Sequence, residues 1–171
     1  IVSANFRSAP VSAGTSSRSK PRITLDFEHI LVIEMPSQSV SPYRWLAEFY
    51  DTLFTFHLPW FAAARKRILG PILPSVGSAC DLACGTGTTA VELARSGLKM
   101  SAVDLSPAMC RIARAQARAA GTRPRVVHAE TRAFRLPKPG DLVHCEYDAL
   151  HHAPRTQDLG KVLASVARAL N

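Results

Sequence analysis

Residues 78–97 read SACDLACGTGTTAVELARSG, with the motif DLACGTG at 81–87 in their middle. The apolar run 78–84 predicts a short buried strand, and 88–97 predicts a helix that ends at Gly97. The Gly-Thr-Gly turn between them leaves backbone N–H groups free and lets a ligand approach the main chain closely. This unit therefore predicts an α/β fold with a ligand site at the glycine turn.

Strands and helices continue to alternate after this unit. We predict strands at 99–105, 125–130 and 141–147, and helices at 106–121 and about 156–170. Ser106 suits the N-cap of its helix and Pro107 suits the first turn. Alternation at this spacing is typical of a Rossmann-like parallel sheet with helices on both faces and right-handed crossovers.

The segment before the sheet predicts two further helices, about 41–56 and 59–69, divided by Pro59. Residues 23–36 have the pattern of a strand or a short helix without an identified partner. Residues 1–22 are rich in Ser and basic groups and have no acid, so we expect them to be flexible. The predicted organisation is a flexible or poorly defined segment, 1–40, followed by one domain, 41–171.

The composition narrows the classes of function that the chain can have. The 171 residues are 47% hydrophobic, which suits a globular core, and no apolar run reaches the roughly 18 residues that span a bilayer. Residues 1–22 carry half of the net charge of +8, so the basic balance does not indicate nucleic-acid binding by the folded part. The four cysteines have no CxxC pair and no zinc spacing, which favours buried thiols in a reducing, cytoplasmic setting.

Two acidic residues near strand ends indicate the ligand. Asp104 follows Gly85 by 19 residues, the distance at which an acid meets a ribose diol. Gly85, Gly87 and Ala90 also fit the dinucleotide pattern G-x-G-x-x-A, so an NAD(P)-dependent oxidoreductase is one alternative. Asp81, however, would repel a pyrophosphate, and it suits a ligand with an ammonium and a sulfonium group.

Three segments carry a resemblance to a known family: DLACGTGTTAVELARSG, AVDLSPAMCRIAR and DLVHCEYDALHH. Over about 43–170 the chain resembles the class I S-adenosylmethionine-dependent methyltransferases, most of all the small-molecule methyltransferase-domain group. The resemblance implies a sheet of order 3-2-1-4-5-7-6 with S-adenosylmethionine across the C-terminal strand edges. The chain has strands for the partial order 3-2-1-4 alone, so we expect it to be truncated, with the C-terminal strands missing.

The resemblance also assigns the donor half of the cofactor site. Asp81 and the backbone at Ala83, Gly85 and Gly87 would hold the methionyl end of the cofactor. An alternative for Asp81 is a carboxylate that is satisfied within its own strand end.

The other expected cofactor contacts follow the second and third strands. Asp104 would bind both ribose hydroxyls, although it could also cap the next helix. Leu105 would lie against the adenine with Met109 nearby, and Glu130 and Thr131 would reach the adenine amino group. The alternative for Glu130 is an ordinary surface acid.

Candidates on the acceptor side are less defined. Cys145 and Glu146 fall where the fourth strand passes the sulfonium, and Tyr50 matches a residue that caps the cofactor, although Cys145 and Tyr50 also suit core packing. Glu146, His151 and His152 are candidates for a general base, and the alternative for the histidines is an exposed loop. The sequence identifies no catalytic residue beyond these.

The predicted function is methyl transfer from S-adenosylmethionine to an unidentified small-molecule acceptor by in-line displacement. Orientation of the two reactants supplies much of the rate in such a reaction, and no metal is needed. The alternative is a truncated module that binds S-adenosylmethionine without turnover. We expect no nucleic-acid or membrane partner, and self-association through the exposed edge of strand 141–147.

Overall fold

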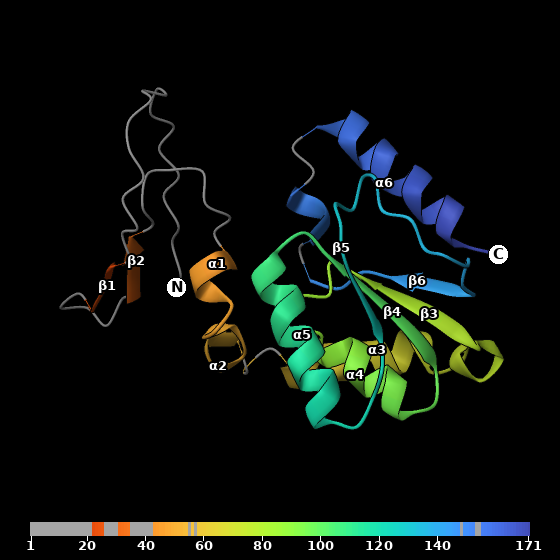
Figure 1. The fold of residues 1–171 in the computed structure, drawn as a ribbon, viewed down its shortest axis with the longest axis horizontal. Helices are drawn as coiled ribbons and strands as arrows, with labels where there is room; N and C mark the ends of the chain where they lie inside the picture. Colours follow the sequence, from red (N-terminus) through yellow and green to blue (C-terminus); the bar gives the residue numbers. More distant parts are fainter. Residues whose placement is uncertain are drawn as a thin grey trace.

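A four-stranded parallel sheet organises the chain (Figure 1). The computed structural model describes residues 22–25, 31–34, 43–54, 56, 58–147, 149–152 and 155–171. The strands are β3 (Ser78–Leu82), β4 (Lys99–Asp104), β5 (Arg125–His128) and β6 (Leu142–His144). Their order is β5-β4-β3-β6, which confirms the predicted partial order 3-2-1-4.

Helices cover both faces of this sheet. They are α4 (Thr88–Arg95), α5 (Pro107–Ala119) and α6 (Thr156–Ala169). Figure 1 shows α4 and α5 on the face opposite to α6. Alternate residues of β3 serve the two sides, because Ala79 packs with Ala90 and Leu93 of α4, whereas Cys80 packs with Val162 of α6.

The predicted helix starts are confirmed, but all four strands end earlier than predicted. Ser106 is the N-cap of α5, where its hydroxyl accepts from the Met109 N–H at 3.4 Å, and Pro107 begins the helix. β6 ends at His144, because the chain leaves the sheet and reaches a positive φ of 62° at Tyr147. The residues after β6 therefore lie beyond the C-terminal end of the sheet and do not pair with β3.

The predicted helix 41–56 is divided into α1 (Tyr43–Leu46) and α2 (Tyr50–Phe54). Between them Phe49 N–H donates to the Leu46 carbonyl at 3.0 Å, a three-residue spacing that tightens the turn and ends the α-helical ladder. α3 (Leu58–Leu69) follows and leads through η2 (Leu73–Ser75) into β3. Asp51 of α2 accepts from Thr86 Oγ1 at 2.6 Å and ties this segment to the glycine turn.

The segment 23–36 contributes strands rather than a helix. β1 (Arg22–Leu25) and β2 (Leu31–Glu34) pair antiparallel with each other. The predicted flexibility of residues 1–22 lies outside the described residues, apart from Arg22 in β1. In the part of the chain that the structure describes, no helix has the length and apolar character needed to cross a membrane.

One carboxylate fastens the N-terminal edge of the sheet. Asp141 Oδ2 accepts from the backbone N–H of Gly77 at 3.0 Å and of Ser78 at 2.8 Å, and from the Ser78 hydroxyl at 3.0 Å. Its Oδ1 accepts from Asn171 Nδ2 at 2.8 Å. The starts of β3 and β6 and the last residue are thus joined at one side chain.

Candidate functional site

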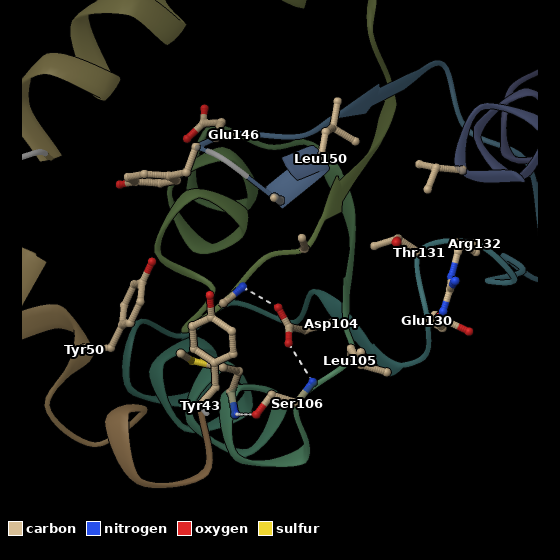
Figure 2. A pocket seen from close by; sticks show the side chains of 16 residues that line it. Tyr43, Tyr50, Asp104, Leu105, Ser106, Glu130, Thr131, Arg132, Glu146 and Leu150 are labelled. Carbon is tan, nitrogen blue, oxygen red and sulfur yellow. Dashed lines mark hydrogen bonds and ion pairs between the residues drawn. The ribbon is translucent and has the colours of Figure 1, made fainter. Parts of the chain in front are cut away.

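A cavity of about 370 Å³ opens where the four parallel strands end (Figure 2), a volume in the range of small-molecule sites. Residues that follow β3, β4, β5 and β6 all contribute to its wall, together with α1, α2, α5 and α6. The lining residues are Tyr43, Tyr50, Ala83, Gly85, Asp104, Leu105, Ser106, Met109, Glu130, Thr131, Arg132, Glu146, Tyr147, Ala149, Leu150 and Val162.

Asp104 stands at the centre of this wall, at the end of β4. Its Oδ2 accepts from the Gly85 N–H at 2.8 Å, and its Oδ1 accepts from the Ser106 N–H at 2.7 Å. Burial raises the pKa of Asp104, and these two backbone hydrogen bonds oppose that shift. The carboxylate is therefore fixed between the glycine turn and the start of α5, and Ser106 rather than Asp104 caps the helix.

The glycine turn has left-handed backbone at three positions. Ala83, Gly85 and Gly87 have φ of 60°, 54° and 83°. A Cβ on Gly85 would meet nothing within 4 Å, which leaves the main chain there open to the cavity. A Cβ on Gly87 would lie 2.7 Å from the Ala113 Cβ, so this glycine allows α4 and α5 to pack closely.

Another part of the cavity wall combines apolar side chains with an ion pair. The apolar side chains are Leu105, which is 60% exposed, and Met109, which is buried. Glu130 pairs with Arg132, which also reaches Asp158 at 3.0 Å. Glu130 lies at the cavity as expected, but it already has a cationic partner that the sequence did not indicate.

Three of the expected contact residues do not line the cavity. Gly87 lies in the packing contact with α5, and Cys145 packs against the core beneath α6. Asp81 is only 3% exposed and lies under the glycine turn, next to His144 of β6. The structure brings the remaining expected contacts together, including Tyr50 and Glu146.

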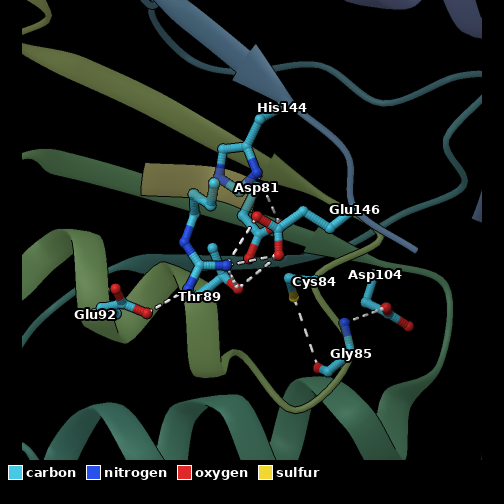
Figure 3. A network of polar contacts seen from close by, with 9 residues as sticks. Asp81, Cys84, Gly85, Thr89, Glu92, Asp104, His144 and Glu146 are labelled. Carbon is cyan, nitrogen blue, oxygen red and sulfur yellow. Dashed lines mark hydrogen bonds and ion pairs between the residues drawn. The ribbon is translucent and has the colours of Figure 1, made fainter. Parts of the chain in front are cut away.

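Asp81 and His144 form a buried pair between neighbouring strands (Figure 3). Asp81 Oδ1 is 3.7 Å from His144 Nδ1, and Asp81 Oδ2 and both ring nitrogens have no hydrogen-bond partner among the described residues. Burial, and then the charge of Glu146, raise the pKa of Asp81 to about 8, while burial lowers the pKa of His144. Both shifts favour a neutral pair at neutral pH.

Arg65 of α3 adds a second buried polar group. Its Nη1 donates to both carboxylate oxygens of Glu146 at 2.8 and 2.7 Å and to Thr89 Oγ1 at 3.0 Å, and its Nη2 donates to Glu92. Arg65 is 9% exposed. No pattern in the sequence indicates this role, because a charged residue on a surface helix usually lies on the solvated face.

Three tyrosine rings contribute to the cavity wall, those of Tyr43, Tyr50 and Tyr147. Tyr43 and Tyr50 meet edge to face with centroids 6.3 Å apart, and Tyr147 lies against Phe61 at 4.0 Å. The candidate bases His151 and His152 belong to η3 (Ala149–His152), which borders the cavity through its first two residues. The side chains of both histidines lie outside the described residues.

The profile of a known family covers the strands and helices that build this site. Residues 79–171, more than half of the chain, match the family described as "Methyltransferase domain". The chain belongs to this family. The methyltransferase domain accordingly includes the glycine turn and Asp104, whereas Arg65 and the tyrosines of α1 and α2 come from the segment before the match.

Solved structures agree with this assignment. An S-adenosylmethionine-dependent methyltransferase from Clostridium acetobutylicum is 26% identical at a TM-score of 0.63, over 77% of this chain and 54% of its own. A sugar N-methyltransferase from Streptoalloteichus is 29% identical at a TM-score of 0.63, over 81% and 56%. The protein DesVI of Streptomyces venezuelae is 25% identical at the same score, over 78% and 55%.

The chain thus spans about half the length of these solved neighbours. None of the curated protein sequences matches the chain.

Proposed function

We propose that this methyltransferase domain binds S-adenosylmethionine in the cavity and moves its methyl group to a small-molecule acceptor by in-line displacement. The observation that carries the proposal is the fixed carboxylate of Asp104 in the cavity wall, beside the open main chain of Gly85. The family match and the solved neighbours support the same activity.

The polar and apolar groups that line the cavity fit this cofactor. Each oxygen of Asp104 accepts one backbone hydrogen bond, and an ionised carboxylate has about four acceptor sites, so both oxygens can also accept from a ribose diol. Leu105 and Met109 offer an apolar wall to a flat base, and Thr131 and Glu130 offer polar groups at its rim. The backbone at Ala83 and Gly85 is accessible to the methionyl end.

When bound, S-adenosylmethionine would supply a methyl group already activated on its sulfonium. The chain's own residues then have to hold the donor, orient the acceptor and exclude water. Glu146, Tyr147 and Leu150 all follow β6 and line the cavity, so we assign acceptor binding to that side. Glu146 is hydrogen-bonded by Arg65 and Thr89, an arrangement that suits a fixed anion better than a base that exchanges protons.

Calorimetry tests the cofactor assignment. We expect S-adenosylmethionine and S-adenosylhomocysteine to bind and NAD to give no heat, because the Glu146 carboxylate in the cavity wall would repel a pyrophosphate. Binding of NAD alone would identify an oxidoreductase-type site and contradict the proposal.

Turnover needs its own experiment, because the chain spans about half the length of its solved neighbours. A screen with labelled cofactor should begin with amino sugars, since one neighbour is a sugar N-methyltransferase. Label transfer to an acceptor would support the enzyme. Cofactor binding without transfer to any acceptor would favour the alternative, a binding module without turnover.

A further inference from the structure

Arg65 of α3, which lies outside the glycine turn, holds the carboxylate of the cavity residue Glu146 in place. The Arg65 guanidinium donates to both oxygens of Glu146, and Thr89 Oγ1 donates to Glu146 Oε2 at 3.1 Å. Glu146 lines the cavity, whereas Arg65 and Thr89 do not. The carboxylate therefore faces the ligand space, and the cation that holds it stands behind.

The two carboxylates that pair with Arg65 differ in their surroundings. The Glu92 side chain is 57% exposed on α4, so solvent screens its charge. The Glu146 side chain is 16% exposed and shares its surroundings with Asp81, which lies under the same turn. The local charge on the cavity side is therefore negative, and it depends on the Glu146 carboxylate staying turned toward the ligand.

We propose that Arg65 is a positioning residue: through Glu146, it raises the affinity of the cavity for a positively charged ligand relative to the neutral counterpart of that ligand. The inference rests on the proposed function, in which this pair is S-adenosylmethionine, with its sulfonium, and S-adenosylhomocysteine, with an uncharged sulfur. It concerns charge selection at the site and goes beyond the binding of the cofactor itself.

Loss of Arg65 has a defined electrostatic consequence. Without the guanidinium, the Glu146 carboxylate loses the cation whose hydrogen bonds to both oxygens hold it in the cavity wall. A largely buried carboxylate without a cation is better solvated in water than inside the protein, so we expect the Glu146 side chain to turn toward solvent. The negative charge that faces the ligand then leaves the cavity wall, and the advantage of the cationic ligand falls.

The experiment measures the ratio of the two affinities by calorimetry at low ionic strength. For Arg65→Met and for Glu146→Gln we expect the preference for S-adenosylmethionine over S-adenosylhomocysteine to fall about fivefold or more, as for one charge interaction at an intermediate effective dielectric. The double variant should show no larger fall than Glu146→Gln alone, because Arg65 acts through Glu146. A loss of packing alone would weaken both ligands equally and leave the ratio unchanged.

Two control variants remove a charge without altering the cavity wall. Arg67 is exposed on the same helix as Arg65, and Glu92 is the other partner of Arg65 outside the cavity. The affinity ratios of Arg67→Met and Glu92→Gln should stay within about twofold of the parent chain, because screened charges away from the ligand contribute little.

The outcomes separate the two proposals. If the parent chain binds neither ligand, the proposed function fails and this inference falls with it. If both ligands bind and the ratio is the same in parent, Glu146→Gln and folded Arg65→Met, the charge selection is wrong while the cofactor site stands. Should Arg65→Met not fold, Arg65→Lys and Glu146→Gln decide: an unchanged ratio in Glu146→Gln overturns the inference.

Discussion

At the scale of single residues, the site depends on side chains and backbone conformations that the fold itself holds in place. Asp104 joins the glycine turn to α5, and Asp81 lies buried beside His144. Ala83 holds a left-handed backbone conformation that is costly for a residue with a Cβ. Each of these features gives a separate prediction.

Replacement of Asp104 should weaken cofactor binding. A hydrogen bond to a charged group contributes about 1.5–3 kcal/mol, so Asp104→Ala should lower the affinity for S-adenosylhomocysteine roughly ten- to a hundredfold in calorimetry. Asp104→Asn keeps one acceptor oxygen and should lose less. Unaltered affinity in a folded Asp104→Ala variant would show that the ribose assignment is wrong.

Ala83→Gly should stabilise the protein. Its φ of 60° costs an alanine about 1–2 kcal/mol, and the greater flexibility of glycine in the unfolded chain returns about half of this. We expect a net gain of about 0.5–1 kcal/mol in urea unfolding. Ala79→Gly, in the middle of the buried core of β3, is the matched control and should destabilise. A loss of stability in Ala83→Gly would contradict the strain argument.

Asp81→Asn should change how stability varies with pH. The folded protein keeps a proton on Asp81 up to a pKa of about 8, whereas the unfolded chain loses it near 3.8. The contribution of Asp81 to stability therefore falls as the pH rises between these values. The melting temperature of Asp81→Asn relative to the parent should increase from pH 5 to pH 8.5. Parallel curves over this range would refute the raised pKa.

At the scale of secondary structure, the packing of α4 against α5 sets the shape of the turn. α4 begins immediately after Gly87, which lies against Ala113 of α5. The glycine thus serves the contact between helices as well as the turn. The packing role of Gly87 can be tested separately from ligand binding, because Gly87 does not line the cavity.

Gly87→Ala should destabilise the fold by about 2 kcal/mol or more. The added Cβ would lie 2.7 Å from Ala113 Cβ and 3.1 Å from its Cα, and the backbone has a φ of 83°. Gly97→Ala is the matched control, since Gly97 has a φ of 99° with nothing within 4 Å of an added Cβ. Denaturant unfolding should show the smaller loss for Gly97→Ala. Equal losses would mean that the helix contact contributes nothing.

At the scale of the whole molecule, the sheet has an open side. Among the described strands β6 pairs with β3 alone, and just before it Gly140 forms a single bridge with Leu170. On the side of β6 that faces away from β3, the backbone N–H and C=O groups are presented outward. Strand edges of this kind pair with other chains.

We therefore expect concentration-dependent self-association of this polypeptide. Light scattering after size exclusion should show a mass above that of one chain as the concentration rises. A constant mass of 18.6 kDa over a hundredfold range of concentration would show that the edge is protected.

Much of the fold was predictable from local patterns. The four parallel strands and the start of α5 follow from apolar periodicity, from the glycine turn and from Ser106 before Pro107, whereas the order of the strands came from the resemblance to the methyltransferase family. The break between α1 and α2 was not predictable, because helical spacing of apolar residues continues across it while hydrogen bonding changes to a three-residue spacing.

The site was predictable where backbone conformation determines it. Gly85 and Asp104 belong to a turn and a strand end that the sequence specifies by itself. Arg65 and Arg132 were missed, because Arg65 reaches Glu146 across 81 residues and Arg132, in a turn, reaches Asp158 of α6 across 26 residues. Long-range ion pairs leave no periodic signal in a sequence, so the charge of the cavity wall required the folded chain.

The carboxylate of Asp141 makes the N-terminal rim of the sheet more sensitive to acid than the C-terminal rim, which holds the cavity. Hydrogen bonds from Ser78 hold its pKa below the usual range, so its contribution is complete above about pH 4 and is lost as the pH falls through that lower pKa. Acid should therefore loosen the rim that joins β3, β6 and Asn171 before it affects packing elsewhere. In native-state hydrogen exchange, the amides of Ser78 and Asn171 would lose protection together, as one opening unit, while the opposite rim with its cavity stayed closed.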